Sequence, residues 1–123
     1  MNKATRLSEI EDRIKKIKKA LSKLGEMRPG SMSEQFNVCG SPGCRCKDAQ
    51  NPKRHGPYYQ VSYVHRGRSS SQFIRREFVA ATRRQLANYK AFRELTEEWV
   101  GLALEHAKLK LELAKEQLLG TDR

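Results

Sequence analysis

The sequence predicts an α+β protein built from two long helices, antiparallel and coiled-coil-like, with a central cysteine-rich knuckle and a β-hairpin. Apolar residues recur at helical spacing near both ends of the chain. Between them, all three cysteines lie among turn-forming residues, and a run rich in aromatic and β-branched residues follows. We therefore expect one compact domain of three segments: a helix at 1–28, the knuckle and hairpin at 29–76, and a helix at 77–123.

The first segment has the heptad seam of an α-helix. Apolar residues alternate at spacings of three and four, namely Leu7, Ile10, Ile14, Ile17, Leu21 and Leu24. Gly25 and the pair Pro29-Gly30 supply the stop. Lysines lie between the seam positions, and we interpret them as a solvated face beside a packing seam: Lys15, Lys16, Lys18, Lys19 and Lys23.

Residues 29–57 contain four prolines and four glycines, too many breakers for a long regular element. The cysteines suggest what orders this stretch. Three thiols and one imidazole occur within 17 residues, and glycines between them let the backbone turn sharply enough for the thiolates to converge. We expect a Zn²⁺ site whose ligands are Cys39, Cys44, Cys46 and His55.

Alternatives to this ligand set stay open. His65 or Asp48 can substitute for the fourth ligand. Three cysteines form an odd number, which argues against a disulfide framework but leaves a loop of buried or free thiols as the main alternative and a catalytic cysteine as a remote one.

The next segment has the composition of a β-hairpin. Tyr58 to Val64 is rich in aromatic and β-branched residues, residues 65–68 hold Gly67 in a turn, and residues 69–76 supply the second strand.

The helical period returns from about Glu77 to about Leu119 without a proline, a length near 60 Å at about 1.5 Å per residue. One apolar stripe consists of Phe92, Leu95, Trp99, Leu102, His106, Leu109 and Leu113. A second consists of Leu104, Ala107, Leu111, Ala114 and Leu118. The first helix and the hairpin are too short to cover both stripes, so we expect a homo-oligomer, with a monomeric helical hairpin as the alternative.

Two kinds of polar residue on this helix are interpreted as structural. His106 lies on the first stripe and is expected to be a core or interface histidine. The acids are expected to form a solvated face: Glu94, Glu97, Glu98, Glu105, Glu112 and Glu116.

Basic residues are in excess and unevenly distributed. The chain carries 25 Lys and Arg against 14 Asp and Glu, a formal net charge of +11. Residues 45–76 hold eight of these bases and one acid, so this segment nets +7. Such a surplus attracts polyanions, and we expect nucleic acid to be the partner.

Composition also excludes several classes. No stretch approaches the roughly 18 to 20 consecutive apolar residues of a membrane span, and the N-terminus lacks the apolar segment of a signal peptide. We expect a cytoplasmic protein without membrane contact, associated with the nucleoid if DNA is its target. No Walker loop, dinucleotide fingerprint, nucleophile elbow or paired-histidine nuclease site occurs in the sequence, so we expect no enzymatic activity and no catalytic residues.

The middle of the chain carries a specific set of motifs: Met27-Arg28-Pro29-Gly30-Ser31, Ser33-Glu34-Gln35-Phe36-Asn37-Val38-Cys39-Gly40, Cys44-Arg45-Cys46-Lys47, His55-Gly56-Pro57-Tyr58-Tyr59-Gln60, Ser62-Tyr63 and Arg66-Gly67. Through them, about residues 27–93 resemble a family of small uncharacterised bacterial and archaeal proteins. The resemblance implies that the three cysteines and His55 act as one unit, and it implies a link to mobile elements such as transposons. It implies no established activity.

We therefore expect a zinc-stabilised, oligomeric protein that binds DNA or RNA through a basic surface of the knuckle and hairpin. Phosphate contacts are expected from Arg45, Lys47, Lys53, Arg54, Arg75 and Arg76. Arg66 and Arg68 at the hairpin tip are expected to enter a groove, and Tyr58 or Tyr63 to stack on an unpaired base. The alternative is a coiled-coil adaptor that binds a larger protein, such as a transposase or nuclease.

Overall fold

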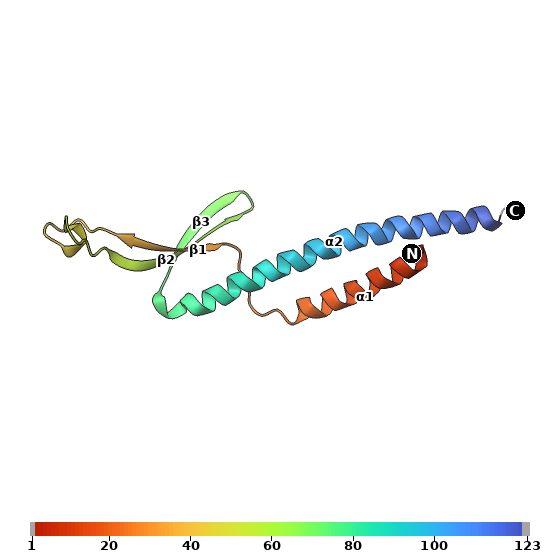
Figure 1. Ribbon diagram of the computed structural model, residues 1–123, viewed down its shortest axis with the longest axis horizontal. Helices are drawn as coiled ribbons and strands as arrows, with labels where there is room; N and C mark the ends of the chain where they lie inside the picture. Colours follow the sequence, from red (N-terminus) through yellow and green to blue (C-terminus); the bar gives the residue numbers. More distant parts are fainter. Residues whose placement is uncertain (1, 122–123) are drawn as a thin grey trace. The chain divides into compact units, whose positions relative to one another are not determined.

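The computed structural model describes residues 2–121 and has two α-helices, three strands and two short 3₁₀ helices (Figure 1). In chain order these are α1 (Lys3–Ser22), β1 (Ser31–Asn37), η1 (Arg45–Lys47), β2 (His55–His65), β3 (Arg68–Ile74), η2 (Arg76–Phe78) and α2 (Val79–Thr121). The predicted α+β class and both long helices are confirmed. The sheet contains the predicted two-stranded hairpin and has a third strand that was not predicted, because β1 pairs with β2. No helix within residues 2–121 is long and apolar enough to cross a membrane.

The chain forms two compact units. The helical unit contains residues up to Gly25 and residues from Lys90 onward, so it holds α1 and most of α2. The sheet unit is Glu26–Tyr89, which holds the three strands, the cysteine segment and the beginning of α2.

In the helical unit, α1 lies antiparallel beside α2 (Figure 1). Asn2 caps α1, since its side-chain Oδ1 accepts a hydrogen bond of 2.7 Å from the Thr5 backbone N–H. The predicted seam is confirmed, because Ile10 and Ile17 are fully buried and the other seam residues are half-buried. Burial of this one stripe holds the short helix on the long one.

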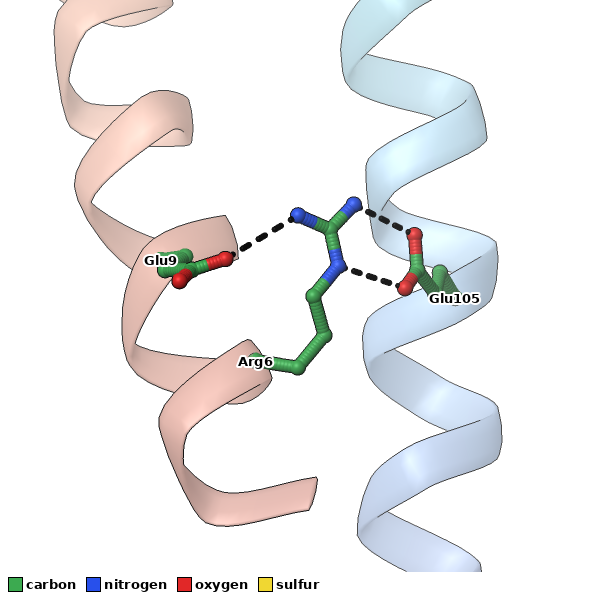
Figure 2. Close-up of polar contacts among 3 residues, drawn as sticks. All are labelled: Arg6, Glu9 and Glu105. Carbon is green, nitrogen blue, oxygen red and sulfur yellow. Dashed lines mark hydrogen bonds and ion pairs between the residues drawn. The ribbon is translucent and has the colours of Figure 1, made fainter. Parts of the chain in front are cut away.

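Ion pairs border this seam at intervals of seven residues along α2. Arg13 donates two hydrogen bonds to Glu98, at 2.6 and 2.7 Å, and Arg6 donates two to Glu105, at 2.7 and 2.8 Å. Figure 2 shows Arg6 between Glu105 and Glu9 of its own helix. These glutamates were expected to form a solvated face. They instead bind α1, because the antiparallel packing places a base opposite each of them.

The N-terminal end of α1 continues the same pattern. Lys3 pairs with both Glu112 and Glu116 of α2. On the other side of the helix pair, His106 Nε2 lies 3.2 Å from Glu11 Oε2, in agreement with the expected interface histidine. The two helices are thus held by a narrow apolar seam with polar contacts on both of its edges.

The sheet has the order β1-β2-β3, and both pairs are antiparallel. The predicted hairpin is confirmed: β2 and β3 meet at a two-residue turn of Arg66 and Gly67, which have φ angles of 51° and 77°. Two consecutive positive φ values are typical of the turn that matches the twist of antiparallel strands.

Alternation along the strands divides the sheet into two faces. One face carries Tyr59, Val61 and Tyr63, and Val61 is fully buried. The segment before β1 and the beginning of α2 lie on this face, where Arg28 donates a 3.0 Å hydrogen bond to Gln72 and its backbone N–H bonds the Gln85 carbonyl at 3.2 Å. The opposite face carries exposed residues, including Tyr58, Val64 and Phe73.

Candidate metal centre

The four predicted metal ligands come from three neighbouring elements of the sheet unit. Cys39 follows the end of β1, Cys44 is the residue that precedes η1, and Cys46 lies inside η1. His55 is the first residue of β2. Because β1 and β2 pair at this end, with Asn37 opposite His55, the sheet itself brings the first and last ligands together.

The ligand atoms converge on one point. All four lie within 4.8 Å of one another, with Cys39 Sγ 3.6 Å from Cys46 Sγ and Cys44 Sγ 3.2 Å from His55 Nε2. Tetrahedral zinc bond lengths imply separations of about 3.8 Å between two sulfurs and about 3.6 Å between sulfur and nitrogen. The cluster can therefore bind a metal ion with small side-chain adjustments.

The thiols are free, and their surroundings suit ligation. None of the three cysteines forms a disulfide. Cys46 is buried, whereas Cys39, Cys44 and His55 are half-buried. The Cys39 backbone N–H also donates a 3.3 Å hydrogen bond to Cys46 Sγ, which orients this thiol within the cluster.

The loop between the ligands is folded by turns around the buried Cys46. The backbone N–H of Cys44 bonds the Ser41 carbonyl at 3.4 Å, and Gly43 between them has a φ of 77°. After η1, the Lys53 backbone N–H bonds the Arg45 carbonyl at 2.9 Å, which closes the segment and returns the chain to β2. Glycine and proline at these turns are what the sequence pattern anticipated.

An irregularity in the sheet orients His55. Gln35 pairs with Tyr58 while Asn37 pairs with His55, so β2 has one residue more than β1 in this interval. Without that extra residue, Asn37 would pair with Gly56 instead of His55. Because a shift of one residue turns a strand side chain to the other face of the sheet, the extra residue decides the face on which the His55 side chain lies. Gly56 has a φ of 137°, and a Cβ there would lie 2.7 Å from the Gln35 carbonyl oxygen, so only glycine fits.

Electrostatics within the cluster favour thiolate at two positions. Hydrogen bonds from the Ser41 backbone and from His55 lower the pKa of Cys39 to about 6. The Cys46 backbone N–H lowers the pKa of Cys44, and hydrogen bonds to Cys39 and Cys44 raise the pKa of His55. The pKa of Cys46 is raised, because burial and the two neighbouring thiols outweigh the hydrogen bond from the Cys39 backbone.

The fourth member of the cluster is His55. The residues that were open as substitutes lie elsewhere: His65 is at the far end of β2, opposite Arg68, and Asp48 Oδ1 accepts a 3.0 Å hydrogen bond from the Gln50 backbone N–H. Among residues 2–121, the group of side chains able to hold a metal ion is Cys39, Cys44, Cys46 and His55.

The predicted phosphate-contacting residues fall into groups along the sheet. The knuckle cations, Arg45, Lys47, Lys53 and Arg54, are exposed around the cluster. The tip cations, Arg66 and Arg68, are exposed at the opposite end of β2, and Arg75 and Arg76 follow β3 near Tyr58 and Tyr59. The structure thus separates the knuckle cations from the tip cations by the length of β2.

The two tyrosines predicted to stack on bases lie on opposite faces. Tyr58 is 43% exposed on the open face, whereas Tyr63 is half-buried on the face next to the beginning of α2. Phe73, which was not predicted, is exposed on the open face of β3. Tyr58 and Phe73 line one shallow hollow together with Arg75 and Arg76. The register of β2 with β3 brings Tyr58 and Phe73 together, and no local sequence pattern reveals that register.

The fold and site define a class of small α+β proteins in which a Cys₃His cluster closes one end of a three-stranded sheet. The chain belongs to the DUF6788 family, a domain of unknown function whose family model matches residues 7–84. The resemblance to an uncharacterised family is therefore confirmed, and the match extends through most of α1, which was expected to lie outside it. No curated protein and no solved structure matches the chain.

Proposed function

We propose that this protein binds nucleic acid through its sheet unit, and that Zn²⁺ in the Cys₃His cluster holds that unit in shape. The chemistry of the cluster supports zinc, since three thiols and one imidazole are a common ligand set for structural zinc. Four protein ligands leave no open position for a reacting molecule, which supports a structural metal and a protein without enzymatic activity.

The observation that carries the proposal is a set of exposed, unpaired cations in the sheet unit, some of which lie beside exposed aromatic side chains. In the helical unit, Lys3, Arg6 and Arg13 are ion-paired with α2, whereas the lysines of the solvated face of α1 form no ion pair within the described chain. In the sheet unit, most predicted phosphate contacts form no ion pair within the described chain, namely Arg45, Lys47, Lys53, Arg54, Arg66, Arg68 and Arg76. Exposed cations that have no internal partner are available to phosphates.

The spacing of these cations suits an extended polyanion. β2 has 11 residues, which at about 3.3 Å per residue separates the knuckle cations from the tip cations by roughly 33 Å. This is close to one turn of duplex DNA, about 34 Å. Arg75 and Arg76 lie between the two groups along the strand direction, so one backbone can contact all three sets.

The open face of the sheet supports contact with unpaired bases. Tyr58 and Phe73 line one hollow with two arginines, which combines an aromatic surface for a base with positive charge for its phosphate. DNA and RNA both fit this chemistry. The link to mobile elements that the resemblance implies is part of the proposal and predicts that the target belongs to such an element.

Binding of labelled oligonucleotides to the zinc-loaded protein tests the proposal. We expect Arg45→Ala with Arg54→Ala to weaken binding of single-stranded or duplex probes. The matched control removes the same charge from α1, by Lys16→Ala with Lys19→Ala, and we expect it to have little effect. No binding to any DNA or RNA at low salt would favour the adaptor, which binds a larger protein through its helices.

A further inference from the structure

The face of α2 that points away from α1 carries an uncovered apolar stripe. Val100, Leu104 and Leu111 are 60%, 69% and 64% exposed, and Ala107 and Ala114 are exposed as well. The spacings are four, three, four and three residues, so these side chains follow one side of the helix. A seam of this kind is the pattern by which one helix packs along another.

α1 does not compete for this stripe. It contacts the other side of α2, where Glu98 and Glu105 bind its arginines and Leu102 and Leu109 are half-buried. Toward the beginning of the helix the stripe ends at Glu97, which pairs with Arg93 at 3.4 Å. The apolar seam therefore has a defined boundary at Glu97, whereas toward the C-terminal end of the helix it continues to Leu118. The boundary at Glu97 limits the register of any helix that packs on the seam.

We propose that the stripe binds the same stripe of a second copy of this chain, with the two α2 helices antiparallel. In the register centred between Glu105 and His106, Val100 packs on the partner's Leu111 and Leu104 packs on the partner's Ala107. Symmetry repeats both contacts, so four layers form, and a large residue meets a smaller one in each.

The charges beside the stripe favour an antiparallel pair of α2 helices over a parallel pair. In the antiparallel register Glu94 lies beside the partner's Lys115, and symmetry makes this pair twice. A parallel pair would instead place Lys110 beside the partner's Lys115, which is repulsive. Neither Glu94 nor Lys115 forms an ion pair within residues 2–121, so both are available to a second chain.

A dimer of this kind carries two sheet units and two metal clusters. Two binding units on one molecule raise the apparent affinity for a target that has two sites. The proposed dimer contacts all lie in the helical unit, so the dimer does not depend on whether the sheet unit binds nucleic acid.

Sedimentation of the full-length, zinc-loaded protein over a range of concentrations tests the dimer. We expect the mass to rise from 14.2 kDa toward twice that value. Leu104→Lys should weaken dimerisation about tenfold or more, because it places a charge in the seam. Leu119→Lys is the matched control, since Leu119 is 66% exposed but lies off the stripe, and it should leave the dimer intact. Both positions are exposed, so circular dichroism should show folded proteins.

A charge exchange tests the antiparallel register. Lys115→Glu should weaken the dimer several-fold, because it faces the partner's Glu94, and adding Glu94→Lys should restore it. A mass of 14.2 kDa at every concentration would overturn the dimer. An oligomer unaffected by Leu104→Lys would overturn the stripe as its interface, and failure of the double variant to recover would overturn the register.

Discussion

Cys44 and His55 lie side by side at the end of the sheet, with Sγ and Nε2 3.2 Å apart across a separation of eleven residues. One belongs to a turn with local backbone hydrogen bonds, and the other begins a strand that pairs with β1. A bound metal would therefore join the least regular part of the chain to the sheet, and its binding energy would contribute directly to folding.

Metal content is the first prediction. Protein purified without chelator should contain about one zinc per chain by elemental analysis. Cys44→Ser should lose the metal and the order of the segment around residues 39–55, which amide resonances would report. Asp48→Asn should keep the metal, because Asp48 lies outside the cluster. Absence of stoichiometric zinc in the unmodified protein would contradict the prediction.

The second prediction concerns the glycine next to His55. Gly56→Ala should destabilise the sheet unit by about 1–3 kcal/mol and weaken metal binding, because its Cβ would meet the Gln35 carbonyl and its φ of 137° disfavours alanine. Gly40→Ala is the control, since nothing lies within 4 Å of a Cβ there. Chemical unfolding with zinc titration measures both effects. Equal stability of the two variants would show that the strand irregularity does not depend on glycine.

The third prediction concerns acid. Hydrogen bonds from Arg13 and Arg6 lower the pKa values of Glu98 and Glu105 below 4.5. A carboxyl whose pKa is lower in the folded state adds stability above the unfolded value, and this stability is lost as the pH falls below 4.5 through the lowered values.

Comparison with a variant isolates this contribution. Glu98→Gln with Glu105→Gln should be less stable than the unmodified protein at pH 7, and the difference should shrink between pH 5 and pH 3. Thermal unfolding at a series of pH values measures it, and the metal cluster is the same in both proteins. A difference that stays constant with pH would contradict a role for these ion pairs.

The fourth prediction concerns base stacking. Tyr58→Ala or Phe73→Ala should weaken binding of single-stranded probes about tenfold, because each removes an exposed aromatic ring from the open face. Val64→Ala is the control, since Val64 is 64% exposed on the same face but has no ring. If both aromatic variants bind single strands as the unmodified protein does, the open face is not the site of base contact.

The two long helices and the residues of the metal cluster were predictable from sequence, because local patterns encode them. The seam that contains Ile10 and Ile17 requires only helical spacing, and both residues are fully buried. The thiols of the cluster are close in sequence, and turn formers between them let their side chains converge.

Features that depend on non-local pairing were not predictable. Ser31–Asn37 has no apolar alternation and becomes a strand because β2 provides hydrogen-bonding partners for it. Likewise, the sequence around Glu105 is typical of a solvated helix face, and the ion pair with Arg6 depends on the packing of α1 against α2. The exposure of Phe73 beside Tyr58 depends on the register of β2 with β3, which the sequence of either strand alone does not encode.

The salt dependence of nucleic-acid binding tests the proposed function most directly. Affinity for duplex DNA should fall steeply with salt, and the logarithmic slope should decrease by about 0.9 for each phosphate contact removed. We expect Arg75→Ala to weaken binding evenly across sequences, and Arg66→Ala or Arg68→Ala to relax any sequence preference as well. Binding that survives unchanged in the variant lacking Arg66, Arg68, Arg75 and Arg76 would move the site to the lysines of α1, and no binding to DNA or RNA would contradict the function itself.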